Sequence, residues 1–219
     1  MPDKNTTVDD RLAEVRESVG RLPADIKATL QAEVARLAQE GLPAGVATPG
    51  TAMPDGDLLD AHGKPTTLTE TRAGRPAVVI LYRGVWCPYC NVALRFYQET
   101  LAGELDSRGV ALVAISPQKP DGSLSVAEKH NLEYPVLSDP GNQVARGLGV
   151  VFSHSGELHA VQAKMGLDLT TVNADGTHEL PLATAVVVDA AGTIRWIDAR
   201  ADYTTRSEPA DILAAVDSL

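Results

Sequence analysis

The chain has 219 residues, of which 44% are hydrophobic, and this is enough for one sizeable domain with an extension. Its formal net charge of −10 and its lack of a long basic run argue against nucleic acid, whose phosphates are neutralised by Lys and Arg. The same charge argues against anionic membranes, and no apolar run approaches the roughly 20 residues that span a bilayer. The first residues lack an apolar signal core, so we expect a soluble, cytoplasmic protein.

Two helices are predicted at the start of the chain, because apolar residues recur every three or four positions in two stretches. The second stretch covers about 23–40, where Pro23 suits a first helical turn and Gly41 ends the pattern. We expect the pair to pack on the main domain or on a partner subunit. The apolar positions are Val8, Leu12, Val15 and Val19 in the first helix and Ile26, Leu30, Val34 and Leu37 in the second.

Residues 41–56 are rich in glycine and proline, which predicts a linker or an irregular lead-in to the main domain. No internal repeat and no low-complexity tract is detected elsewhere. We therefore divide the chain into an N-terminal helical extension over 1–45 and a domain over 46–219.

Strand and helix patterns alternate in this domain. Continuous apolar runs over 77–82 and 110–116 predict strands covered on both faces, with a helix over 88–107 between them. The whole order predicts an α/β fold with a mixed central sheet flanked by helices. The remaining predicted elements are helices over 122–131, 144–148, 156–165 and 207–219, strands over 134–137, 185–189 and 193–199, and a long connection over 166–181.

The only two cysteines of the chain, Cys87 and Cys90, are three positions apart in the segment WCPYC. In a cytosolic protein a lone CxxC is more often redox-active or metal-binding than structural. Zinc normally takes four ligands, and neither a second cysteine pair nor ligand-like spacing among the five histidines is present. We expect His154 and His159 on a solvated surface segment and His130 at the end of a helix. The pair therefore indicates thiol redox chemistry.

Cys87 falls where a buried strand ends and a helix begins, the edge at which open α/β sheets place their sites. The helix N-terminus should favour its thiolate, with the nearby arginine as a further positive charge. Cys90 follows one helical turn later on the same side, deeper in the helix. We expect an exposed, ionised Cys87 to attack an oxidised partner and Cys90 to release it by forming a disulfide. The expected rim of the site consists of Arg83, Gly84, Trp86 and Pro88.

The segment 82–91 (YRGVWCPYCN) resembles the peroxiredoxin-like proteins of the alkyl hydroperoxide reductase/thiol-specific antioxidant (AhpC/TSA) group. The likeness extends from about residue 47 to the end of the chain. It implies a thioredoxin-like fold without a cofactor and the reduction of hydroperoxides, with Cys87 peroxidatic and Cys90 resolving. It further implies electrons from thioredoxin or a similar thiol, and the first two helices are a candidate homodimer interface.

Two positions depart from the pattern of this group. Typical peroxiredoxins have a threonine three residues before the peroxidatic cysteine, where this chain has Gly84. They also have an arginine before the later core strand, whereas segment 180–184 (LPLAT) holds none, and Ala183 occupies the cis-proline position of thioredoxin-like members. A thiol–disulfide oxidoreductase of thioredoxin or glutaredoxin type therefore stays open as an alternative to the peroxidase, and so does a non-catalytic role.

Overall fold

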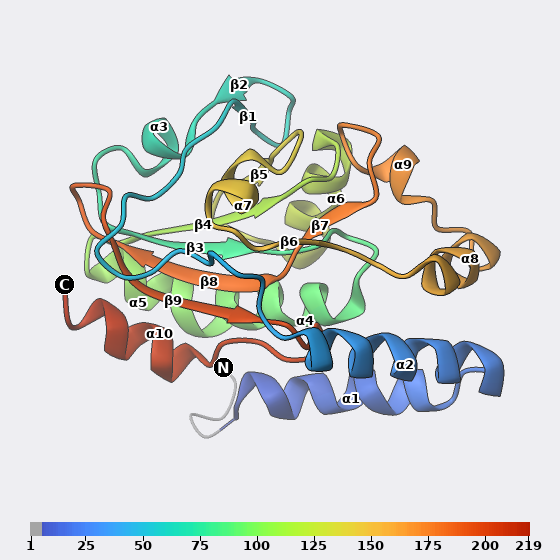
Figure 1. The fold of residues 1–219 in the computed structure, drawn as a ribbon. Helices are drawn as coiled ribbons and strands as arrows, with labels where there is room; N and C mark the ends of the chain where they lie inside the picture. Colours follow the sequence, from blue (N-terminus) through green and yellow to red (C-terminus); the bar gives the residue numbers. More distant parts are fainter. Residues whose placement is uncertain (1–5) are drawn as a thin grey trace.

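A seven-stranded mixed sheet forms the centre of the protein in a computed structural model, which describes residues 6–219 except the side chains of residues 122–126 (Figure 1). The strand order is β2-β1-β5-β4-β3-β8-β9, with β3, β4 and β5 parallel and β8 antiparallel to both β3 and β9. The predicted α/β class and mixed sheet are confirmed. The strands are β1 (Leu58–Leu59), β2 (Pro65–Thr66), β3 (Ala77–Leu81), β4 (Ala111–Ser116), β5 (Val136–Ser138), β8 (Ala183–Val188) and β9 (Ile194–Arg200).

The core lies on both faces of this sheet, because the central strands β3, β4, β5 and β8 are buried at every position. Side chains alternate between the faces, so that Val78 and Ile80 join one buried cluster while Val79 and Leu81 join the other. Helices α4, α5 and α10 cover one face, seen below the sheet in Figure 1, and α3 and α7 lie on the other. The bounds are α3 (Leu68–Arg72), α4 (Pro88–Tyr97), α5 (Gly103–Ser107), α6 (Pro120–His130), α7 (Gln143–Gly147) and α10 (Pro209–Val216).

Several short elements were not predicted from the sequence. The helix over 88–107 contains a π-helical turn, η1 (Gln98–Ala102), between α4 and α5. The predicted connection over 166–181 contains α9 (Leu169–Val172) and β7 (Glu179–Pro181), the latter paired with β6 (Val151–Ser153). Such elements are too short for a periodic pattern to reveal them. Within residues 6–219, no helix is long and apolar enough to cross a membrane.

The predicted N-terminal helices are present as α1 (Val8–Gly20) and α2 (Ala24–Glu40), and they pack on the main domain. Val8 and Leu12 belong to the same buried cluster as α4, and the backbone N–H of Val8 donates to Glu208 at the start of α10, at 2.9 Å. The Thr7 side chain caps α1 by accepting from the backbone of Asp10. The two helices are therefore part of the core.

Helix α2 differs from the prediction in what it buries. Of its four predicted apolar positions only Leu37 is fully buried, while Glu33 is buried against the start of α8 (Gly156–Lys164). The Glu33 carboxylate pairs with Arg36 at 2.7 Å and accepts from the backbone of Ser155 at 3.2 Å. Burial alone raises the pKa of Glu33, but these contacts outweigh burial and hold that pKa below its ordinary value. The carboxylate thus ties α2 to α8, which lie side by side (Figure 1).

Candidate active site

The CxxC motif lies at the junction of β3 and α4, as predicted. Cys87 is the N-cap of α4, and its sulfur accepts from the backbone N–H of Cys90 at 3.3 Å. Pro88 occupies the first helical position, where its missing N–H is not needed. The two sulfurs therefore lie on the same side of the first turn of the helix.

Both cysteines are free thiols, and their sulfurs are 2.8 Å apart. Each residue is 0% exposed and belongs to the buried core. The prediction of an exposed Cys87 is therefore wrong. The sulfur is enclosed because the Arg83 guanidinium donates to it at 3.1 Å and Tyr203 stacks on that guanidinium, with the Arg83 Cζ 4.1 Å from the ring centroid.

A second cation reaches the sulfurs from a distant part of the chain. Arg206, in the loop between β9 and α10, donates to Cys90 at 3.0 Å and lies 3.9 Å from the sulfur of Cys87. Its other nitrogen donates to the backbone carbonyls of Tyr203 and Thr205, at 2.7 and 2.6 Å. Sequence reasoning missed Arg206, which lies 116 positions from Cys90. Segment 180–184 contains no arginine, and Arg206 supplies the dithiol with a positive charge instead.

The two thiols titrate as one pair because they share a hydrogen bond. Burial raises the pKa of Cys90, but the hydrogen bond shared with Cys87 and the charges of Arg206 and Arg83 outweigh burial, so that the pKa of Cys90 lies well below its ordinary value. Burial and the hydrogen bond to Cys90 raise the pKa of Cys87 well above its ordinary value. The first negative charge of the pair is therefore favoured on Cys90, and the remaining proton on Cys87. The sequence predicted the lowered pKa at Cys87, but Arg206 approaches Cys90 more closely.

His154 is the second site residue that sequence reasoning misplaced, because it is buried rather than solvated, at 6% exposed. Its Nε2 lies 3.2 Å from an Nη atom of Arg83, and its Nδ1 faces the amide of Gln162. Burial and then the charge of Arg83 lower the pKa of His154 to about 3. A neutral ring protonated at Nδ1 accepts from Arg83 and donates to Gln162, so His154 orients that guanidinium. His159 is half-buried, and His130 ends α6 as predicted.

Gly84 is required by the packing of Trp86. Its φ of +150° is one that other residues rarely adopt, and a Cβ atom there would lie 2.5 Å from the Trp86 Nε1. The indole fills the space beside Gly84, which explains the absence of the threonine found in typical peroxiredoxins. The described residues contain no cis peptide bond, and Ala183 begins β8.

A cavity of about 690 Å³ opens beside the dithiol, between α1, α2, α8 and the loop that carries Tyr203. Three of the four predicted rim residues, Arg83, Trp86 and Pro88, contribute to its wall, together with His154. Arg83 also donates a hydrogen bond to Cys87, so its guanidinium separates the cavity from the sulfur of Cys87. In the described part of the chain, no group of three or more His, Cys, Asp or Glu side chains could hold a metal ion.

The fold and the buried dithiol at a strand–helix junction define a thioredoxin-like thiol protein. Residues 49–197, more than half of the chain, match the model of the AhpC/TSA family. The chain therefore belongs to the AhpC/TSA family and is a peroxiredoxin-like protein.

Known relatives agree with this assignment. The chain is 32% identical over 101 residues to peroxiredoxin Bcp of Escherichia coli, a match covering 46% of this chain and 64% of that protein. It is 32% identical over 101 residues to the chloroplastic peroxiredoxin Q of Gentiana triflora, covering 46% of each. It thus spans less than two thirds of these curated relatives. Reduced Prx3 of Vibrio vulnificus, solved with hydrogen peroxide, shares the fold with a TM-score of 0.62 and 20% identity, over 78% of this chain and 99% of that chain.

Proposed function

We propose that the protein is a thiol peroxidase that reduces hydroperoxides, with Cys87 as the nucleophile and Cys90 as the resolving thiol. The observation that carries this proposal is the pair of free sulfurs, 2.8 Å apart, held between the guanidinium groups of Arg83 and Arg206. Membership of a peroxiredoxin family supports the same chemistry.

The first step uses the proton that the two sulfurs share. When this proton passes to Cys90, Cys87 becomes the thiolate and attacks the distal oxygen of the peroxide. A sulfur–oxygen bond forms, the oxygen–oxygen bond breaks, and the leaving alkoxide takes a proton from solvent. The product at Cys87 is a sulfenic acid.

The second step closes the disulfide. The Cys90 sulfur attacks the sulfenic sulfur of Cys87, and the hydroxyl leaves with the Cys90 proton as water. Two electrons have then passed from the two sulfurs to the peroxide. A dithiol donor, thioredoxin or a similar thiol, returns them and restores both thiols.

The surroundings of the two sulfurs support these separate roles. Cys87 is the sulfur bonded to Arg83, a residue of the cavity wall, whereas Cys90 is bonded to Arg206 in the loop before α10. Because Cys87 is 0% exposed, the stacked side chains of Arg83 and Tyr203 must move aside before a peroxide touches its sulfur.

The burial of Cys87 and Cys90 also distinguishes between a peroxidase and a thiol–disulfide oxidoreductase. Attack on a protein disulfide brings another polypeptide chain against the sulfur, which needs an exposed thiol. A hydroperoxide group is only two oxygen atoms and needs a far smaller opening. Burial of both cysteines in the reduced protein therefore favours a peroxide as the oxidant, and reduction by a protein donor requires a larger opening once the disulfide has formed.

Stopped-flow measurement of peroxide consumption by the reduced protein tests the proposal, with insulin reduction as the competing assay. We expect fast consumption of one peroxide per chain, a Cys87–Cys90 disulfide by mass spectrometry, and little insulin reduction. Insulin reduction without peroxide consumption would instead establish the oxidoreductase.

We further propose a cytoplasmic location, because a dithiol that cycles needs a reducing compartment. The division into an extension over 1–45 and a domain over 46–219 is supported by the family match, which begins at residue 49. A homodimer through α1 and α2 stays a prediction, and light scattering during gel filtration tests it.

A further inference from the structure

The two arginines beside the dithiol have no carboxylate partner. Arg83 is 3% and Arg206 7% exposed, and within the described residues neither forms an ion pair with Asp or Glu. The Nε of Arg83 lacks even a hydrogen-bond partner there. Buried charges are usually paired, because they lose their hydration. The anion available to both guanidinium groups is the thiolate of the dithiol, whose sulfurs they contact at 3.1 and 3.0 Å.

The aromatic groups around these arginines carry no charge at neutral pH. Burial raises the pKa of Tyr203 to about 12, and burial also raises the pKa of Tyr89. The ring of His154 is neutral because burial and the charge of Arg83 lower its pKa to about 3. None of these three groups can replace the thiolate as a counter-ion.

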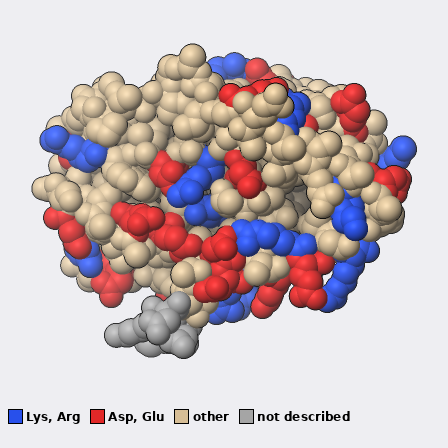
Figure 2. Space-filling model, turned by 60° about the horizontal axis from the view of Figure 1, so that its bottom comes forward, with Lys and Arg blue, Asp and Glu red and all other residues tan. Residues whose placement is uncertain are grey.

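Two carboxylates whose charges act on the tyrosines are engaged elsewhere. Glu33 pairs with Arg36 at 2.7 Å, and Asp202 accepts from the backbone and the hydroxyl of Thr204. On the outer face formed by α1, α2 and α10, acidic side chains are interspersed with basic ones (Figure 2). The net charge of −10 therefore does not place a second counter-ion on the two arginines in the described part of the chain.

Formation of the Cys87–Cys90 disulfide removes the thiolate. The reduced pair gives up two electrons and one proton, and the disulfide that results is neutral. Arg83 and Arg206 then remain buried without a counter-ion, which is the unfavourable state left when one partner of a buried ion pair is lost. The two arginines therefore stabilise the reduced state relative to the oxidised state, and the equilibrium between the two shifts toward the dithiol.

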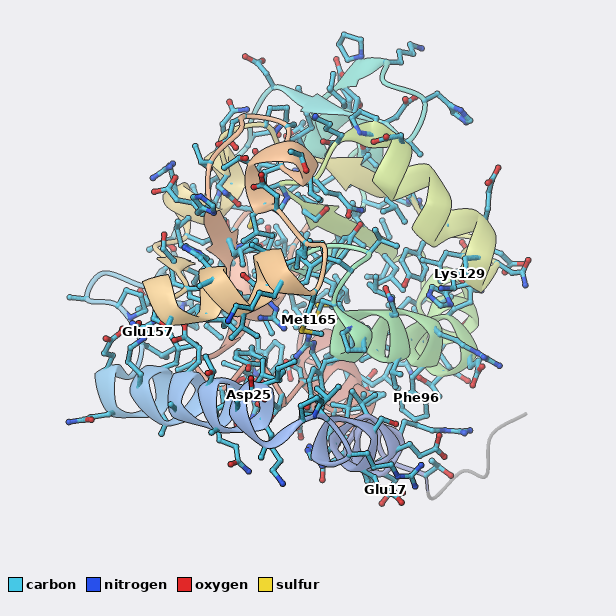
Figure 3. The ribbon with its side chains drawn as sticks, turned by 90° about the vertical axis from the view of Figure 1, so that its right-hand side faces the viewer. Glu17, Asp25, Phe96, Lys129, Glu157 and Met165 are labelled. Carbon is cyan, nitrogen blue, oxygen red and sulfur yellow. The ribbon has the colours of Figure 1, made fainter. Side chains whose placement is uncertain are left out.

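The two arginines differ in their access to solvent. Arg83 lines the cavity of about 690 Å³, and Figure 3 shows Met165 of the cavity wall between α8, α4 and the two N-terminal helices. In the oxidised protein the Arg83 guanidinium can turn into this cavity and regain hydration. The described cavity wall does not include Arg206, which is held by backbone carbonyls. Arg206 should therefore contribute the larger share of the stabilisation.

We propose that the Cys87–Cys90 disulfide is a strong oxidant, so that a weakly reducing monothiol restores the dithiol and the reduced protein leaves other disulfides intact. The observation that carries this inference is the pair of buried arginines whose counter-ion exists only in the reduced state. The inference rests on the proposed peroxidase function for the oxidant. It gives the cycle one direction, from thiols to peroxide.

Reduction takes two molecules of the monothiol. The thiolate of the first attacks the Cys87 sulfur, the bond between the two cysteines breaks, and Cys90 leaves as a thiolate beside Arg206. The thiolate of the second attacks the sulfur of the first, so that the donor disulfide forms and Cys87 leaves and takes a proton. The two donors lose two protons, of which one stays on Cys87 and one goes to solvent. Reduction by a monothiol thus releases one proton per chain.

The released proton makes this equilibrium depend on pH. The protein, oxidised with diamide, is equilibrated in glutathione buffers between pH 6 and 7.5, quenched with acid and alkylated, and mass spectrometry gives the reduced fraction. We expect the ratio [GSH]²/[GSSG] at half reduction to fall about tenfold per pH unit, since one proton is released. Two ordinary thiols, which stay protonated in this range, release none. A ratio that does not change with pH would overturn the inference.

Variants of Arg206 identify the source of the effect. Arg206→Met removes a hydrogen bond to the thiolate and the unpaired cation of the oxidised state, so the ratio at half reduction should rise roughly 10- to 150-fold. Arg206→Lys keeps the charge and should show a smaller rise. Arg195→Met, which removes an exposed guanidinium from β9, is the control and should show none. Equal ratios in Arg206→Met and Arg195→Met would contradict the inference, and the wild-type pH dependence tests it without any variant.

The strength of the oxidant is measured by mixing the protein with thioredoxin at neutral pH. We expect reduced protein and oxidised thioredoxin to be favoured more than about tenfold, a difference of about 30 mV for two electrons. An equilibrium on the side of reduced thioredoxin would refute the inference. The tenfold pH dependence in a protein that consumes no peroxide would refute the peroxidase but not the equilibrium. Fast peroxide consumption with a ratio independent of pH would refute this inference alone.

Discussion

The surroundings of Cys87 and Cys90 differ although the two sulfurs are 2.8 Å apart. Cys87 is bonded to Arg83, whose guanidinium is held by side chains, the imidazole of His154 and the ring of Tyr203. These contacts adjoin the cavity, and a side-chain rotation can break them. The Cys87 side of the dithiol is therefore the side able to open.

Cys90 is bonded to Arg206, whose guanidinium is held by the backbone carbonyls of Tyr203 and Thr205. Backbone carbonyls do not move when a side chain rotates, so these contacts of Arg206 do not depend on the rotamer of a neighbour, as those of Arg83 do. In the proposed mechanism, the negative charge is held on Cys90 beside Arg206 and is used at Cys87, where the side chains of Arg83 and Tyr203 must move aside.

The largest effect is expected from the cysteines themselves. Cys87→Ser removes the nucleophile and should reduce peroxide consumption to the background rate. Cys90→Ser should still consume one peroxide per chain but stop at the sulfenic acid, which dimedone traps for mass spectrometry. A dimedone adduct in Cys87→Ser and none in Cys90→Ser would reverse the two roles.

The second largest loss of rate is expected when the Arg206 guanidinium is removed. Arg206→Met takes a hydrogen bond worth about 1.5–3 kcal/mol from the thiolate, so the rate constant with peroxide at neutral pH should fall roughly 10- to 150-fold. Arg206→Lys keeps the charge and should recover part of the loss. Thermal unfolding of both variants shows whether a loss of rate comes from the missing cation or from lost contacts within the loop between β9 and α10. Equal rates in Arg206→Met and the wild type would show that Arg206 does not assist the reaction with peroxide.

A smaller loss of rate is expected from a change beside Arg83, on the Cys87 side of the dithiol. His154→Leu deletes the acceptor that orients Arg83, which should cost about 0.5–1.5 kcal/mol, a roughly 2- to 13-fold slower reaction. The pKa of His154 is lowered to about 3, so the wild-type ring is neutral above that pH and gains a proton only below it. The pH–rate profile between pH 5 and 8 should therefore lack a step near 6.5. A step there that disappears in His154→Leu would contradict the neutral ring.

The smallest effect on activity is expected at Gly84, where the change acts on stability. Gly84→Ala forces a Cβ atom against Trp86 at a positive φ and should cost about 1–3 kcal/mol. For a chain of this size the unfolding midpoint should fall by roughly 2–12 °C in differential scanning calorimetry. Gly103→Ala, in α5 with open space around it, is the matched control and should not lower the midpoint.

The fold and the position of the dithiol were predictable because their signals are contiguous in the sequence. The apolar runs of β3 and β4 and the strand–CxxC–helix order need no knowledge of tertiary contacts. Arg206 and His154 were not predictable, since only the folded chain brings these distant residues to Arg83 and the sulfurs. Burial of Cys87 was missed for the same reason, as Tyr203 closes over it from the end of β9.

The central claim is that the dithiol carries one proton and one negative charge at neutral pH, with the two arginines holding the anion. Thiolate absorbance at 240 nm between pH 4 and 9 measures this directly, with the variant lacking both cysteines subtracted to remove tyrosine and tryptophan. The account predicts one thiolate per chain that persists well below neutral pH, and no second thiolate up to pH 9. Two thiolates that appear together near pH 8.5–9, the range of ordinary thiols, would contradict it.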